Sequence, residues 1–174
     1  FWIQPLCEGN KGDWTVAQRY STECYDVHPL PYYENFDNPS YVAATNLREF
    51  PVPCMYTKQV SYSTSFYPYL TTNQSVEKNG KSLYLSKSAS WSPSGVNTYV
   101  ALPKMAAPIK DLELTFKMYV TDTKFTLDIG VLEDPLDSTT FDVVTTIKPK
   151  FTNEFVEYTV AFENYTGKGE YIAF

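Results

Sequence analysis

Apolar and polar residues alternate along residues 112–131 of this 174-residue chain. Every second residue from Leu112 to Val120 is apolar, and the residues between them are Glu113, Thr115, Lys117 and Tyr119. After a polar turn around Asp122, a second run repeats the pattern with Phe125, Leu127, Ile129 and Val131. A period of two places one face of a strand on a core and the other in water. Because no stretch has a comparably clean helical period, we predict an all-β fold of antiparallel strands.

Shorter strand-like runs are spaced along the rest of the chain. They occupy residues 33–36, 60–62, 69–72, 82–86, 98–102, 141–147, 156–162 and 171–174. Turn-forming pairs such as Asn79-Gly80 and Asp134-Pro135 separate them. Many short strands at regular spacing are typical of a jelly-roll β-sandwich. Residues 38–50 break the alternation and fit either a short helical turn or an ordered loop.

The first 24 residues have the pattern of a separate hairpin. Two strand-like runs, 1–6 and 15–21, are joined by the turn-rich residues 8–13. Two strands alone cannot hold a core. We therefore interpret residues 1–24 as the last hairpin of a preceding sandwich domain.

Pro29 and Pro31 follow this hairpin and favour an extended linker over residues 25–31. Residues 32–174 then form the second domain. Both ends of the chain fall in strand-like runs, and a domain rarely leaves such a strand bare. We therefore expect the chain to be a fragment of a larger multi-domain protein.

The formal net charge of −6 limits the classes of partner. An acidic chain lacks the basic surface that nucleic-acid binding requires, and it is not attracted to anionic membranes. No apolar run reaches 18 residues, so we expect no direct membrane insertion. Carboxylate-rich loops fit a hard cation such as calcium, although an acidic surface also serves solubility alone.

Three cysteines, Cys7, Cys24 and Cys54, predict one disulfide and one unpaired residue in an extracellular β protein. Cys7 and Cys24 lie in two strand-like runs joined by a polar turn, which is compatible with a bridge. Cys24–Cys54 is the rival pairing, and a fully reduced cytosolic protein is the other interpretation. Of these, we predict the Cys7–Cys24 disulfide.

The sequence contains no recognisable set of catalytic residues. Its one histidine, His28, lies between linker residues rather than beside a nucleophile. Zinc-type spacing of Cys and His and a phosphate-binding glycine loop are both missing from the sequence. Asp134 and Asp137 flank a proline-containing turn, where aspartates commonly cap their own backbone. We therefore predict that the chain is not an enzyme.

Several motifs follow one another in an order that resembles a surface jelly roll common in Bacteroidetes. Residues 30–37 (LPYYENFD) resemble its LPYxENFD opening, and residues 53–55 (PCM) its PxCW step with Met in place of Trp. Later landmarks are residues 79–85 (NGKSLYL), 100–103 (VALP), 128–135 (DIGVLEDP) with 140–141 (TF), 165–167 (YTG) and 171–174 (YIAF). Together they are similar to MAM-like, cleaved-adhesin domains of the choice-of-anchor type. Residues 1–24 resemble the last two strands of a fibronectin type III module.

This resemblance implies a secreted or cell-surface protein exported by type IX secretion, in which such domains mediate adhesion, bind protein or carbohydrate, or act as spacers. It implies host or cell-surface proteins or glycans, and neighbouring domains of the same polypeptide, as partners. The family usually continues into one more strand with an acidic pair, so residues 32–174 are expected to lack the last strand.

The resemblance also implies two sites. A calcium ion is placed near the first strand of the jelly roll, where Glu34, Asn35 and Asp37 supply hard oxygens and carbonyls near Asn79 join. Residues 137–139 (DST) resemble the Bacteroidetes O-glycosylation motif, which makes Ser138 the acceptor.

Aromatic residues make up 17% of the chain. They fit either packing of the sheets or a platform on which a sugar ring stacks. The candidate ligand-binding residues are Tyr67, Tyr69, Trp91 and Tyr99. Trp91 lies in a polar loop with little core to enter, although such a residue often anchors its loop on the sheet. Two functions stay open: a non-catalytic adhesion module, or a carbohydrate-binding accessory domain of a secreted glycan-active enzyme or protease.

Overall fold

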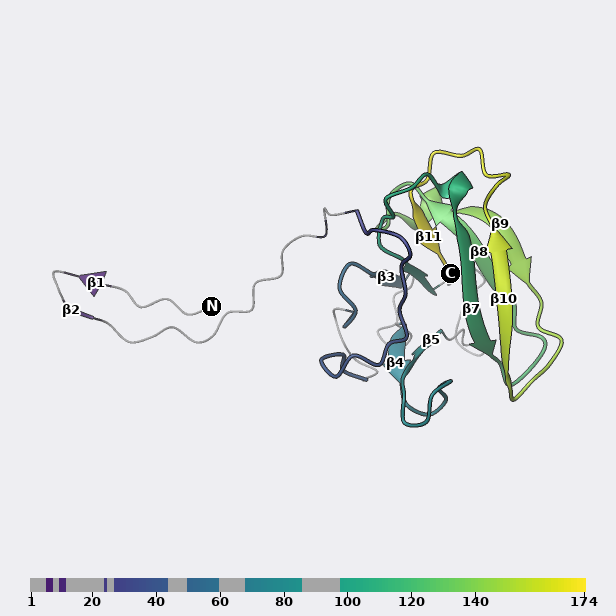
Figure 1. Ribbon diagram of the computed structural model, residues 1–174, viewed down its shortest axis with the longest axis horizontal. Helices are drawn as coiled ribbons and strands as arrows, with labels where there is room; N and C mark the ends of the chain where they lie inside the picture. The colour runs from purple at the N-terminus through teal and green to yellow at the C-terminus, as the bar shows by residue number, and fades with distance from the viewer. Residues whose placement is uncertain are drawn as a thin grey trace.

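A computed structural model describes residues 6–7, 10–11, 24, 27–43, 50–59, 68–85 and 98–174 (Figure 1). The prediction of an all-β fold is confirmed: every named strand in these ranges pairs antiparallel with its neighbours. Helical structure in the described ranges consists of two three-residue 3-10 turns, η1 (Ile109–Asp111) and η2 (Ser138–Thr140). Within the same ranges, no helix has the length and apolarity needed to cross a membrane.

Two layers of strands form the main unit. One is a five-stranded sheet in the order β3-β6-β11-β8-β9. Its strands are β3 (Tyr56–Gln59), β6 (Thr98–Ala101), β11 (Tyr171–Ala173), β8 (Leu127–Leu132) and β9 (Asp142–Ile147). The pair β7 (Glu113–Tyr119) and β10 (Phe155–Ala161) forms the other layer, and β4 (Tyr69–Thr71) and β5 (Ser82–Tyr84) form a separate two-stranded sheet. Figure 1 shows β7 and β10 lying across the sheet that contains β8 and β11.

The main core lies between these layers, and the alternation of residue types explains it. Ile129 and Val131 of β8 are fully buried, and Leu114 and Phe116 of β7 pack against the same cluster. Glu113 and its alternate neighbours on β7 are exposed. Phe162, directly after β10, is also fully buried. These positions give a β-sandwich, while the specific jelly-roll connectivity stays a prediction.

A second, smaller cluster covers the opposite face of the five-stranded sheet. It contains Tyr99, Ala101, Leu132 and Ala173, with Phe141 packed against it. Residues 133–141 pass over this face, and a hydrogen bond from the Tyr99 hydroxyl to the Pro135 carbonyl at 3.0 Å holds them there. A Cβ on Gly130 would come within 2.7 Å of the Phe141 ring, so glycine is needed where the ring crosses β8. This part of the sheet is therefore buried on both faces.

The first residues form a tighter hairpin than the sequence predicts. β1 (Leu6–Cys7) pairs antiparallel with β2 (Asn10–Lys11), so only Glu8 and Gly9 separate the two strands. The predicted return strand at 15–21 lies outside the described residues. Assignment of residues 1–24 to a fibronectin type III module stays a prediction.

The predicted linker over residues 25–31 is described from Val27, and it lies against the main unit. The His28 N–H donates to the Lys104 carbonyl at 2.8 Å, and the Ala106 N–H donates to the His28 carbonyl at 2.9 Å. The His28 ring also contacts Tyr32 edge-on, with 5.4 Å between ring centroids. Two backbone hydrogen bonds thus hold this segment beside residues 104–106.

Candidate functional site

The predicted first strand of the second domain, residues 33–36, is not a strand. Phe36 has a positive φ of 65°, which a bulky L-residue rarely adopts, and this breaks the extended backbone. The Phe36 N–H donates to Glu34 Oε1 at 2.6 Å, and the Asp37 N–H donates to Asn35 Oδ1 at 3.1 Å. The side chains of Glu34 and Asn35, two of the three residues predicted to bind calcium, therefore shape a turn of their own backbone.

Glu34 also interacts with nearby tyrosines. The Tyr41 hydroxyl donates to Glu34 Oε2 at 3.2 Å. Burial and the charge of Glu34 raise the pKa of Tyr41. The same two causes, burial first, raise the pKa of Tyr32 strongly. Both phenols therefore keep their protons at neutral pH, and Tyr41 remains a donor to the carboxylate.

Asp37 connects this turn to a segment 44 residues further along the chain. The Lys81 N–H donates to Asp37 Oδ1 at 2.6 Å. A Cβ on the buried Gly80 would come within 2.8 Å of the same oxygen, so glycine lets the carboxylate approach the backbone. Asn79 adopts a positive φ of 64° in the turn that precedes Lys81. The structure thus brings Asp37 to the loop near Asn79 that the sequence analysis associated with it.

Calcium usually takes six to eight oxygen ligands. In the described part of the chain, no three His, Cys, Asp or Glu side chains are grouped so that they could hold a metal ion. Both oxygens of Glu34, the amide oxygen of Asn35 and one oxygen of Asp37 accept protein hydrogen bonds. These hydrogen bonds give all three side chains a structural role. Calcium binding there stays a prediction.

The predicted Cys7–Cys24 disulfide is wrong. Cys24 is bonded to Cys54, with 5.2 Å between their Cα atoms and a sequence separation of 30, and a cysteine forms only one such bond. The rival pairing in the sequence analysis is therefore the correct one. The hairpin argument failed because β1 pairs with Asn10–Lys11, while the Tyr56 hydroxyl holds the Cys24 carbonyl beside β3 at 3.5 Å.

Of the four aromatic residues predicted to bind a ligand, Tyr99 is not available. Its side chain is only 6% exposed and belongs to the second cluster. Burial, followed by the charges of Asp134 and Asp137, raises the pKa of Tyr99 to about 12. The prediction for Tyr99 is wrong because residues 133–141 cover the face of the sheet on which Tyr99 lies.

Tyr69 has an aromatic partner that the sequence analysis missed. It lies opposite Tyr84 in the β4–β5 register, with ring centroids 4.8 Å apart and planes tilted by 37°. Tyr84 is 44% exposed. Burial, and then the proximity of Tyr84, raises the pKa of Tyr69. Tyr67 and Trp91, the remaining candidates, lie outside the described residues.

The acidic turn after β8 has the predicted capping role. Asp134 Oδ1 accepts from the Leu136 N–H at 2.8 Å, and Asp137 Oδ1 accepts from the Thr139 N–H at 2.9 Å. Ser138 lies in η2, directly after this cap, and is half-buried. Modification of Ser138 stays a prediction.

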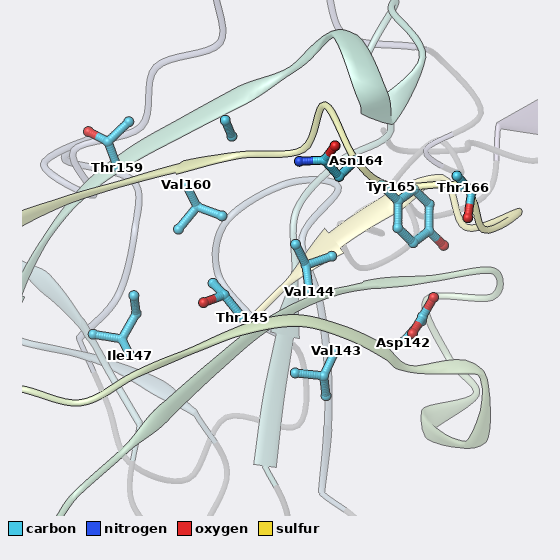
Figure 2. A pocket seen from close by; sticks show the side chains of 11 residues that line it. Asp142, Val143, Val144, Thr145, Ile147, Thr159, Val160, Asn164, Tyr165 and Thr166 are labelled. Carbon is cyan, nitrogen blue, oxygen red and sulfur yellow. The ribbon is translucent and has the colours of Figure 1, made fainter.

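Sequence reasoning also missed a groove of about 530 Å³ between β9 and β10 (Figure 2). β9 contributes Asp142, Val143, Val144, Thr145 and Ile147, and β10 with its following turn contributes Thr159, Val160, Ala161, Asn164, Tyr165 and Thr166. Figure 2 shows Asn164, Tyr165 and Thr166 grouped at the end of the groove near Asp142. The only sequence signal for it is the pair of adjacent valines at 143 and 144, which breaks strict alternation.

Comparisons of this chain with protein-family models, with curated proteins and with solved structures found no match. The geometry described above therefore supplies the arguments for function.

Proposed function

We propose that this chain is a non-catalytic adhesion or interaction module of a larger secreted or cell-surface protein. The proposal rests on large apolar side chains that are exposed along one continuous part of the chain. They are Phe125 (49%), Leu136 (55%), Val143 (49%) and Phe151 (57%), which lie in or beside β8, β9 and β10. Large exposed apolar side chains supply the kind of surface that the apolar core of an interface buries.

The Cys24–Cys54 disulfide supports an extracellular location, because such bonds persist in oxidising compartments. In this proposal the partner is a host or cell-surface protein or glycan, and neighbouring domains of the same polypeptide flank the module. The order of motifs in residues 30–174 supports a bacterial surface protein of the kind exported by type IX secretion.

The test is an adhesion assay with beads that carry the chain, applied to cultured cells and to immobilised extracellular-matrix proteins. We expect the beads to adhere, and we expect the double variant Phe125→Ser, Phe151→Ser to reduce adhesion. Val42→Ser is the matched control, because Val42 is also exposed (55%) but lies outside residues 125–151. Adhesion no greater than that of albumin-coated beads would reject the proposal.

A carbohydrate-binding accessory domain is the alternative, and the Tyr69–Tyr84 pair is the observation that favours it. The two rings lie side by side on one face of the β4–β5 pair. Each ring carries a hydroxyl, a group that can donate a hydrogen bond to a sugar and accept one from it. Rigid aromatic surface with nearby polar groups is the usual composition of a small-ligand site.

A glycan array separates the two functions. If the alternative is correct, reproducible sugar binding is lost in Tyr69→Ala with Tyr84→Ala, and in Trp91→Ala. It is retained in Tyr33→Ala, because Tyr33 is 83% exposed and belongs to no described ring pair. An array without reproducible signal rejects the alternative and leaves the adhesion module.

A further inference from the structure

The groove between β9 and β10 separates two strands that each have one side without a strand partner among the described residues. β9 is the last strand of the five-stranded sheet, and β10 has β7 as its only strand partner in the described part of the chain. Each strand therefore presents backbone N–H and C=O groups toward its open side. An open strand edge is a template on which another extended chain can add.

The backbone groups on the open side of β10 can be assigned from its register with β7. The Phe162 N–H donates to the Leu112 carbonyl at 3.1 Å, and bonded pairs in an antiparallel ladder recur at every second residue. Val156, Tyr158 and Val160 therefore bond to β7. The backbone groups that point away from β7 belong to Phe155, Glu157, Thr159 and Ala161.

β10 lacks most of the features that usually protect an edge strand. Proteins block open edges with bulges, prolines, charged side chains (lysine above all) or very short strands. β10 is seven residues long, contains no proline, glycine or lysine, and has one charged residue, Glu157. β9 is different, because its register with β8 shifts between Ile129 and Gly130, opposite Val144. β10 is thus the edge that can accept a regular added strand.

The residues lining the groove give the chemistry of such a strand. Val144 and Ile147 pack against the main core, Val160 belongs to it, and Val143 is 49% exposed. An added strand would therefore place an apolar side chain into the groove at every second residue. Asp142 is the only charged residue among the eleven that line the groove.

Glu157 on β10 and Glu163 just after it are also exposed. Glu157 lies opposite Lys117 in the register, but the one ion pair among the described residues joins Lys104 and Glu170. Exposed Lys148 and Lys168 lie beyond the two ends of the lining, so the charge within the groove itself is the single carboxylate of Asp142. This one negative charge favours a basic side chain in the partner. A second copy of this chain would instead bring the same carboxylate, and a second net charge of −6, against it.

We propose that the groove between β9 and β10 binds an extended peptide segment of a partner protein, which adds as a strand to β10. The peptide carries apolar residues at alternate positions and lysine or arginine between them. This inference rests on the proposed interaction function and specifies its partner and its surface.

The test begins with selection from a displayed library of random peptides against the full chain. We expect enriched peptides to alternate apolar residues with basic ones, and Thr159→Pro to weaken their binding about tenfold, because proline removes a backbone donor on the open side of β10. Thr115→Pro is the matched control: Thr115 and Thr159 contact each other at 3.1 Å, and the Thr115 N–H points away from the groove. Dissociation constants are measured by fluorescence polarisation.

A second pair of variants leaves the backbone unchanged. Val143→Asp removes an apolar side chain from the groove, whereas Val76→Asp changes a residue of equal exposure (49%) in the β4–β5 connection. We expect only Val143→Asp to weaken binding. Equal effects within both pairs of variants, or no enriched peptides, would overturn the inference while leaving the bead-adhesion result unaffected. A dimer in analytical ultracentrifugation that only Thr159→Pro dissociates would also overturn it, in favour of self-association.

Discussion

Replacing Asp37 tests whether its carboxylate joins two distant parts of the domain. Asp37 Oδ1 accepts the Lys81 N–H at 2.6 Å, across 44 residues of sequence. Hydrogen bonds to charged acceptors contribute about 1.5–3 kcal/mol to stability. Alanine at position 37 removes the acceptor and leaves the partly buried Lys81 N–H without it. We therefore expect Asp37→Ala to lower the free energy of unfolding by about 1.5–3 kcal/mol.

The assay is urea denaturation of the full chain followed by circular dichroism, together with thermal unfolding. For a domain of this size, the expected loss corresponds to a decrease in Tm of roughly 3–12 °C. Asp122→Ala is the control, because Asp122 Oδ1 accepts from Lys124 N–H at 2.9 Å, only two residues away and exposed. Removal of this local hydrogen bond is expected to cost about 0.5 kcal/mol or less.

Equal stability losses in Asp37→Ala and Asp122→Ala would refute the reasoning, since the long-range contact would then contribute nothing beyond a local turn.

Asp37→Asn extends the experiment to calcium, because asparagine retains an acceptor for Lys81 but removes the charge. If calcium binds as predicted, a chelator lowers the Tm of the wild-type chain and has a smaller effect on Asp37→Asn.

Two further predictions concern the covalent and the buried contacts. Cys54→Ser opens a loop with a sequence separation of 30 and is expected to lower stability by about 3–4 kcal/mol, whereas Cys7→Ser has no such effect; peptide mapping that recovers a Cys7–Cys24 linkage would contradict this. The raised pKa of Tyr99, about 12 in the folded chain against about 10 unfolded, means that its contribution to stability is complete below pH 10 and is lost as the pH rises toward 12. Tyr99→Phe should therefore flatten the loss of stability between pH 10 and 12, and an unchanged slope in denaturation curves would argue against it.

The sequence predicts the long strands well because each has one buried face. The run from Leu112 to Val120 becomes β7 (Glu113–Tyr119), and the predicted 156–162 becomes β10 (Phe155–Ala161). In these strands burial repeats with a period of two, so the pattern of residue types contains the whole signal. The predicted 141–147 also becomes β9 (Asp142–Ile147), although the register shift opposite Val144 interrupts its period of two.

The errors arise where contacts from elsewhere in the chain decide the outcome. Residues 33–36 fail as a strand because Phe36 adopts a positive φ, in a turn that Glu34 supports. Tyr99 is buried by a segment more than 30 residues away, which its own neighbours do not reveal. The disulfide depends on how Cys24 and Cys54 meet in space, and spacing alone left two pairings open. The Tyr69–Tyr84 pair and the groove likewise require the register and the order of strands.

The disulfide has a mechanical consequence for a module that works under tension. A pulling force applied through the residues before Cys24 passes directly to Cys54 through the covalent bond. The intervening residues 25–53, including the turn at Glu34–Asp37, are bypassed and bear none of that load. The force enters the fold just ahead of β3 (Tyr56–Gln59), so the Glu34–Asp37 turn keeps its geometry while the chain on either side is stretched.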